Sequence, residues 1–97
     1  MAENIITLNV TYTVRSGQGE AFAQALDQEG VLERVRREPG CLQYELFAAV
    51  GKADRLMLVE RWDGQDNLDA HSAGENFKAM QAVEKTYVTD VDVRRFG

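Results

Sequence analysis

The stretch "LVERWDGQDNLDAH", from Leu58 to His71, holds the only tryptophan and the only histidine of the chain, nine residues apart. If its first part is a strand, successive side chains alternate between two faces, and Glu60 and Trp62 lie on the same face. A turn and a short helical pattern follow, and Asp63, with Asp66 three residues later, resembles a helix N-cap with an acidic first turn. We therefore predict a strand that leads directly into a helix.

The segment before this junction alternates apolar and polar residues and then changes period. In "NIITLNVTYTVR" (residues 4–15) every second residue is apolar, which predicts a long first strand. Helix-forming residues with a period near 3.6 then run from Gly19 to about Arg37. We expect Gly30 to bend or weaken this helix and Pro39 to end it. The inward residues of the first strand are Ile6, Leu8, Val10, Tyr12 and Val14.

Three further strands and a second helix are indicated by the rest of the chain. "CLQYELFA" (41–48) predicts a second strand with Leu42, Tyr44 and Leu46 on one face, and "VGKAD" (50–54) predicts a hairpin loop. "RLMLVERW" (55–62) is the third strand, and the second helix runs from about Gln65 to about Glu84 with a break near Gly74. "TYVTDVDVRRF" (86–96) closes the chain as a fourth strand.

This order of elements, β-α-β-β-α-β, predicts an α+β ferredoxin-like domain spanning residues 1–97. Right-handed crossovers then give a four-stranded antiparallel sheet with both helices on one face. The other face would carry bulky apolar residues, namely Ile5, Phe47, Met57 and Val59. Exposed apolar patches usually mark interfaces, so we expect a second copy to pack there and form a two-fold homodimer.

Composition excludes several classes of function. With 44% apolar and 28% charged residues the chain has the composition of a globular protein, and its net charge of −5 argues against nucleic-acid or anionic-membrane binding. The start "MAENIITLNV" has no signal-peptide pattern, no apolar run reaches ~20 residues, and the single Cys41 forms no internal disulfide. We expect a cytoplasmic protein. One histidine and one cysteine offer no metal cluster, so we expect no metal.

Two motifs carry a resemblance to a known family. "EPGCLQYELF" (38–47) and "LVERWDGQDNLDAHSAGENF" (58–77) resemble the antibiotic biosynthesis monooxygenase family, which includes quinol monooxygenases, an isomerase branch and, more distantly, haem-degrading enzymes. The sharpest features are Gly40-Cys41-Leu42 with Tyr44-Glu45, followed by Glu60-x-Trp62 and His71. The resemblance implies a dimeric α+β barrel, with a pocket in each subunit between the sheet and its own helices.

The resemblance also implies chemistry without a cofactor. A quinol or another polyphenolic substrate loses a proton, and its anion then gives an electron to O₂. His71 is the natural base, because an ordinary imidazole accepts a proton near neutral pH. Trp62 would form a wall of the pocket, and Glu60 would orient His71 or bind a substrate hydroxyl, so these three are the candidate catalytic residues. The candidate substrate-binding residues are Tyr12, Tyr44, Leu58, Leu68, Asn76 and Phe77.

Simpler interpretations of the same residues remain open. His71 and Trp62 could serve packing alone, and Glu60 could pair with Arg61, Arg94 or Arg95. Asn76 stands where many family members carry a second histidine, and it cannot act as a base. Haem-degrading relatives use an asparagine on the first strand. Here Asn9 alternates with the inward residues and should point to the uncovered face, so haem breakdown is disfavoured. The alternative functions are a non-catalytic dimeric module for small-molecule binding or stress response, and a small-metabolite isomerase.

Overall fold

The computed structural model describes residues 4–97, so part of the expectation about the stretch "MAENIITLNV" falls on residues 1–3, outside the described residues. Eight elements follow one another in the order β-α-α-β-β-α-α-β. They are β1 (Ile5–Val14), α1 (Gly19–Glu29), α2 (Val31–Arg36), β2 (Cys41–Ala48), β3 (Arg55–Asp63), α3 (Gln65–Ser72), α4 (Glu75–Tyr87) and β4 (Val88–Phe96).

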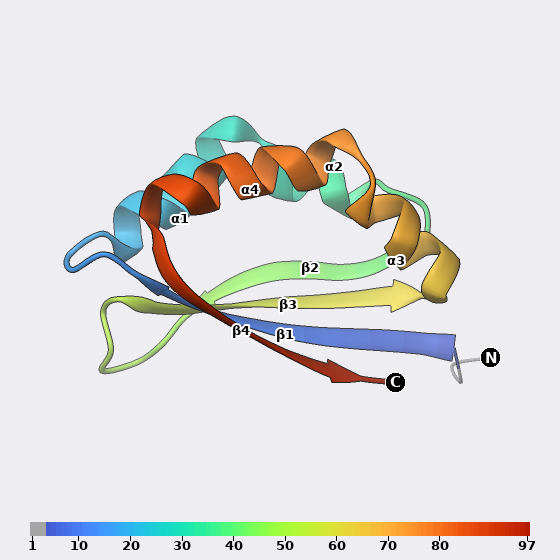
Figure 1. Cartoon of the computed structure of the whole chain (residues 1–97), viewed down its shortest axis with the longest axis horizontal. Helices are drawn as coiled ribbons and strands as arrows, with labels where there is room; N and C mark the ends of the chain where they lie inside the picture. Colours follow the sequence, from blue (N-terminus) through green and yellow to red (C-terminus); the bar gives the residue numbers. More distant parts are fainter. Residues whose placement is uncertain (1–3) are drawn as a thin grey trace.

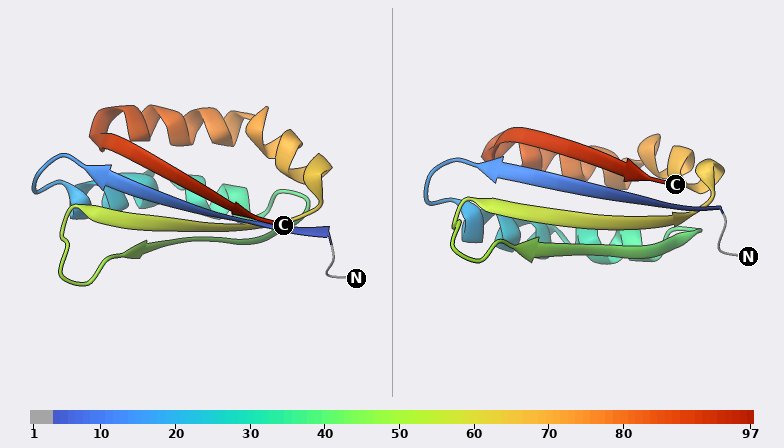
Figure 2. Two further views of the ribbon diagram at one scale, coloured as in Figure 1. Left: turned by 60° about the horizontal axis from the view of Figure 1, so that its bottom comes forward. Right: turned by 90° about the horizontal axis from the view of Figure 1, so that it is seen from below.

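The strands form one antiparallel sheet in the order β2-β3-β1-β4. All the helices lie over one face of the sheet (Figure 1), and the opposite face has no helix over it (Figure 2). The predicted α+β ferredoxin-like fold is thus confirmed. No helix within residues 4–97 combines the length and the apolar character that a bilayer crossing requires.

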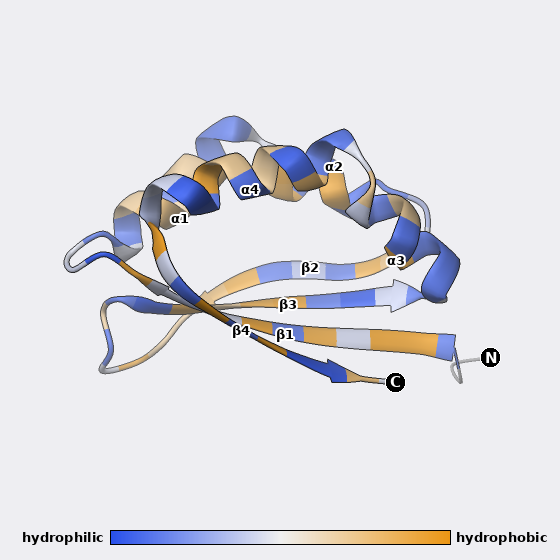
Figure 3. Ribbon diagram, in the orientation of Figure 1, coloured by the Kyte–Doolittle hydropathy of each residue, from blue (hydrophilic) through white to orange (hydrophobic). Residues whose placement is uncertain are grey.

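The core lies between the sheet and the helices. Strand β1 alternates as predicted, with Ile6, Val10, Tyr12 and Val14 buried and their neighbours less so. Figure 3 shows apolar stretches along both the strands and the helices. Buried side chains from the two form one cluster in this layer. The buried apolar side chains are Ile6, Val10, Tyr12, Val14, Phe22, Leu26, Val31, Val35, Tyr44, Leu56, Leu58, Trp62, Leu68, Met80 and Val83.

Each predicted helix is a pair of helices. Gly30 adopts a left-handed conformation (φ 68°) and its N–H bonds the carbonyl of Asp27, which ends α1. The interruption expected at Gly30 is thus confirmed, and it divides the helix into two instead of only bending it, because a left-handed residue stops the helical ladder. The break near Gly74 is confirmed, but α4 continues to Tyr87, so the last strand begins at Val88 rather than at Thr86.

Two local predictions around the ends of β2 and β3 were wrong. Cys41 pairs with Trp62 and Gln43 pairs with Arg61, so Leu42 falls in a bulge and is 47% exposed instead of facing the core. The N-cap of α3 is Gly64, whereas Asp63 is the last residue of β3. No side chain among the described residues caps the N–H groups at the start of α3, and the amide of Asn67 instead donates to the main-chain carbonyl of Asp63 (2.6 Å).

Candidate active site

Strand β3 and helix α3 bring Trp62 and His71 together, as the spacing predicts. Trp62 is the last inward residue of β3, and His71 is the second inward residue of α3, one turn after Leu68. The two rings are stacked, with centroids 4.6 Å apart and planes 27° from parallel. The short connection through Gly64 therefore places the only imidazole of the chain on the face of its only indole.

Two other aromatic rings enclose the imidazole. Tyr44 from β2 and Phe77 from α4 meet His71 edge-on, at centroid distances of 5.6 Å and 5.5 Å. Trp62 is 0% exposed, and His71 and Tyr44 are each 2% exposed. Side chains thus fill the space beneath α3, and four separate elements contribute to it.

The carboxylate that faces His71 comes from Glu38, just after α2. Nδ1 of His71 lies 3.0 Å from Oε1 and 3.3 Å from Oε2 of Glu38. The side-chain amide of Asn76 donates to Oε2 of Glu38 (2.9 Å), and Nε of Arg34 donates to the amide oxygen of Asn76 (3.0 Å). Sequence reasoning missed Glu38, whose position before Pro39 indicated only a helix end.

The second ring nitrogen of His71 is free. No hydrogen bond joins Nε2 to another group of residues 4–97. Every fully buried polar side-chain atom in that part of the chain does have a hydrogen-bond partner. Nε2 therefore belongs to the small part of the ring that keeps access to solvent. A nitrogen of this kind can accept a proton when Nδ1 carries the ring's own hydrogen.

Glu60 is a buried acid beside this cluster. It is 7% exposed, and one of its oxygens accepts a hydrogen bond from Nε1 of Trp62 (3.0 Å). Burial raises the pKa of Glu60, while the Trp62 bond and the nearby His71 act in the opposite direction. Its partner is thus an indole and not an arginine; Arg94 bonds Asp92, and Arg95 bonds Gln65.

A second, partly buried acid lies along the same interior. The hydroxyl of Tyr12 donates to Oε2 of Glu84 on α4 (2.5 Å), and burial raises the pKa of Glu84. Tyr12 also packs edge-on against Phe22, with centroids 5.2 Å apart. Burial, followed by the negative charge of Glu60, raises the pKa of Tyr44. The two tyrosines therefore remain neutral hydroxyls near neutral pH.

The remaining candidate residues occupy the same layer. Leu58 is 1% exposed and lies in the inward row of β3 between Leu56 and Glu60, and Leu68 is 7% exposed. Most of the predicted site residues thus lie buried between the sheet and the helices, whereas Asn76 and Phe77 are only partly buried. Asn9 pairs with Val59 and lines a groove on the uncovered face, as its parity predicts.

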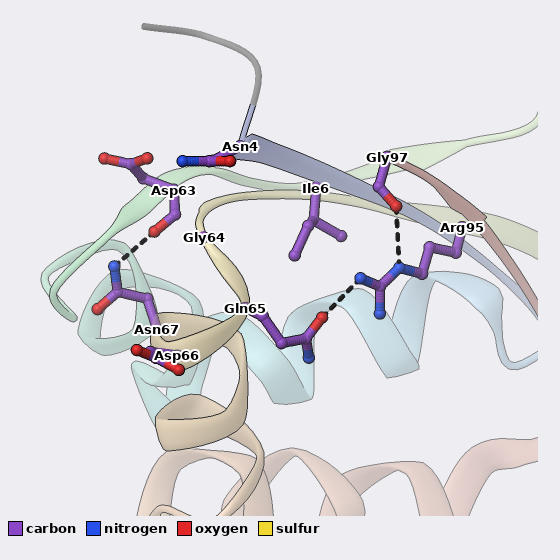
Figure 4. Close-up of a pocket in the computed structure, with 9 residues that line it drawn as sticks. All are labelled: Asn4, Ile6, Asp63, Gly64, Gln65, Asp66, Asn67, Arg95 and Gly97. Atoms are coloured by element: carbon purple, nitrogen blue, oxygen red, sulfur yellow. Dashed lines mark hydrogen bonds between the residues drawn. The ribbon is translucent and has the colours of Figure 1, made fainter.

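An open cavity lies at the strand-to-helix junction itself. Its volume is about 530 Å³. The guanidinium of Arg95 donates to the side chain of Gln65 (2.5 Å) and to the carbonyl of Gly97 (3.2 Å), as seen among the lining residues in Figure 4. Neither Trp62 nor His71 lines it. The lining residues are Asn4, Ile6, Asp63, Gly64, Gln65, Asp66, Asn67, Arg95 and Gly97.

Metal ligation and thiol chemistry find little support in the described part of the chain. Within residues 4–97 no three His, Cys, Asp or Glu side chains gather in a way that could hold a metal ion. Burial, followed by the negative charge of Glu38, raises the pKa of Cys41. A thiol with a raised pKa is a poor nucleophile.

The elements form an α+β domain of the ferredoxin-like class, and comparison with known proteins gives the family. Residues 5–83 match the family described as "Antibiotic biosynthesis monooxygenase", and the chain belongs to this family. It is 25% identical over 81 residues to the Bacillus subtilis (strain 168) protein named "Putative monooxygenase YcnE", which covers 84% of this chain and 83% of the relative.

Solved structures share the fold. A Nitrosomonas europaea protein described as a "putative antibiotic biosynthesis monooxygenase" superposes with a TM-score of 0.86 at 18% identity, over 97% of this chain and 89% of that one. A Pseudomonas aeruginosa protein gives a TM-score of 0.85 at 24% identity, over 99% and 95% of the two chains.

Proposed function

We propose that the protein is a cofactor-free monooxygenase that oxidises a quinol or another polyphenolic aromatic with O₂. The observation that carries this proposal is the state of His71: it is buried against Trp62, Nδ1 faces a carboxylate and Nε2 is free. A base in an apolar enclosure is what such chemistry requires of a protein, because the electron-rich substrate supplies the electrons itself.

The proposed reaction balances without any further reductant. Nε2 of His71 takes a proton from a substrate hydroxyl, and the resulting anion transfers one electron to O₂. The substrate radical and superoxide combine into a peroxide, and cleavage of its O–O bond leaves one oxygen on the ring and releases the other as water. In net terms a dihydroxybenzene and O₂ give a hydroxyquinone and water, and the proton held by His71 leaves with the water.

The closed packing sets a condition on substrate entry. The rings of Trp62, His71 and Tyr44 fill the space in which a flat substrate would stack. A substrate ring is therefore admitted only when α3 or the Trp62 side chain moves. Helix α3 is short, and contacts between it and the rest of the protein involve mainly β3 and α4, so it is the element best suited to such a movement.

Oxygen uptake tests this proposal. The protein is incubated with a panel of hydroquinones and polyphenols while dissolved O₂ is followed, with the same mixture under nitrogen and a heat-denatured sample as controls. We expect uptake above the autoxidation rate with at least one substrate and one water formed per O₂. Uptake equal to autoxidation across the whole panel would contradict the proposal.

The same closed packing favours a second candidate, a non-catalytic module that binds a small molecule. In that case the stacked Trp62 and His71 are part of the core, which is consistent with their exposures of 0% and 2%. The two functions separate in the same experiment. A module of this kind binds a phenol, as seen in quenched Trp62 fluorescence, but adds nothing to oxygen uptake.

We further propose that two copies of the chain pack through the uncovered sheet face. Phe47 and Phe96 are 48% and 54% exposed on that face, and a nearby groove carries Asp90 and Asp92 together with basic residues. A face with apolar residues and both signs of charge can pair with itself across a two-fold axis.

Light scattering at micromolar concentration should give about twice the chain mass. Phe47→Glu should lower the measured mass towards that of one chain. A wild-type monomer would contradict the proposal.

A further inference from the structure

Three side chains form a continuous hydrogen-bonded path from the surface to the buried face of His71. The path runs from Arg34 on α2 to Asn76 on α4, then to Glu38, and ends at Nδ1 of His71. Its links measure 3.0, 2.9 and 3.0 Å. The guanidinium of Arg34 is itself fixed, because Nη1 donates to the carbonyl of Glu29 (2.6 Å).

We propose that Glu38 is a positioning residue, which fixes His71 as the tautomer with hydrogen on Nδ1 and a lone pair on Nε2. This inference rests on the proposed oxygenase function, since it specifies how the base of that site is prepared. Glu38 does not need to touch the substrate. Its carboxylate acts through the imidazole alone.

The chemistry of the carboxylate gives the direction of the Nδ1 bond. An ionised carboxylate only accepts hydrogen bonds, so Nδ1 must donate to Glu38 whenever the ring is neutral. A neutral imidazole carries one hydrogen, and Nε2 is then left as an acceptor. The charge of Glu38 also stabilises the imidazolium that forms once Nε2 has taken a proton, as a carboxylate does for histidine bases in other enzymes.

The rest of the path holds the carboxylate in place. Glu38 follows α2 and precedes Pro39, so it belongs to a connection and not to a regular element. Its side chain is 20% exposed and would be free to rotate without an anchor. Asn76 provides this anchor by donating to the second oxygen of Glu38, and Arg34 orients Asn76 by donating to the amide oxygen. Asn76 thus has a positioning role, which it can fill although it cannot act as a base.

Nitrogen-15 NMR of the imidazole tests the proposal directly, because His71 is the only histidine of the chain and its signals need no assignment. The two ring nitrogens have different chemical shifts according to which of them carries the hydrogen. The spectrum is recorded at about pH 8, where an ordinary imidazole is neutral. We expect the wild-type protein to show hydrogen on Nδ1.

Three variants make the test specific. Glu38→Ala removes the acceptor and should shift the population towards hydrogen on Nε2. Asn76→Ala leaves the carboxylate in place but unanchored, so the shift should be in the same direction and smaller. Glu33→Ala is the matched control, because it removes the same charge from the exposed side of α2, the helix that precedes Glu38, where Glu33 forms an ion pair with Arg36. It should leave the spectrum unchanged.

The outcomes test the positioning role of Glu38 separately from the proposed oxygenase function. Hydrogen on Nε2 in the wild type, or an unchanged tautomer in Glu38→Ala, would overturn the positioning role. If Glu38→Ala does not fold, the Asn76→Ala spectrum decides in the same way. In an active enzyme, Glu38→Ala should lower kcat roughly tenfold or more and leave KM nearly unchanged. If no hydroquinone is oxidised, the proposed function fails, while the tautomer measurement still decides the role of Glu38.

Discussion

Replacement of His71 by alanine is expected to lower oxygen uptake with the best hydroquinone by about 10²–10⁴-fold, the usual contribution of a positioned base. The reason is that Nε2 of His71 has no hydrogen-bond partner among residues 4–97, and alanine leaves no imidazole there to take the proton of the substrate. Steady-state uptake at saturating and limiting substrate measures the loss, which should fall mainly on kcat.

His71→Asn is the matched control for packing. Its amide reaches about as far as Nδ1, so it can still donate to Glu38, but it cannot take a proton at neutral pH. If His71 is a base, both variants lose activity to a similar extent; if it only packs α3 onto the sheet, His71→Asn keeps it. Full activity in both variants would contradict a base at this position. Leu68→Ala, one turn earlier on the same helix face, shows how much of any loss comes from a weakened helix contact.

The approach of Trp62 to His71 could be predicted because it depends on local geometry. A strand places every second residue inward, a helix places residues three apart on one face, and the junction between them is too short to change the relative placement. The same arguments predicted the inward row of β1 and an antiparallel sheet with the helices on one face, since these follow from periodicity and from right-handed connections.

Features that depend on a single residue in a connection could not be predicted. Leu42 faces outward because one extra residue in β2 shifts the register, and no alternation pattern reveals such a bulge. Glu38 reaches His71 although the two are 33 positions apart, and its neighbours Arg36 and Arg37 indicate an exposed helix face. Glu60 was placed correctly on the inward face, but its bond to Trp62 two residues along the same strand was not considered.

The second large effect is expected at Trp62, where replacement by phenylalanine should destabilise the protein more strongly as the pH rises. Trp62 is fully buried and its Nε1 donates to the carboxylate of Glu60. Phenylalanine keeps most of the ring but has no N–H. A lost hydrogen bond to a charged group costs about 1.5–3 kcal/mol, and the smaller ring leaves a cavity that adds to this cost. Urea unfolding at fixed protein concentration measures the difference from wild type.

The pH dependence of this difference identifies its cause. Burial raises the pKa of Glu60 in the folded protein, so the stability linked to this group is fully present below its unfolded pKa and is lost as the pH rises through the folded one. The Trp62 bond opposes that shift, and its removal raises the pKa of Glu60 further. The Trp62→Phe deficit should therefore be smallest in acid, where Glu60 is protonated in both proteins, and widen towards neutral pH. In a Glu60→Gln background no carboxylate remains to titrate, so the deficit should be the same at every pH. A deficit of the same size at every pH in the original background would show that Trp62 stabilises the protein by packing alone, and one that widens equally in both backgrounds would show that Glu60 is not the group responsible.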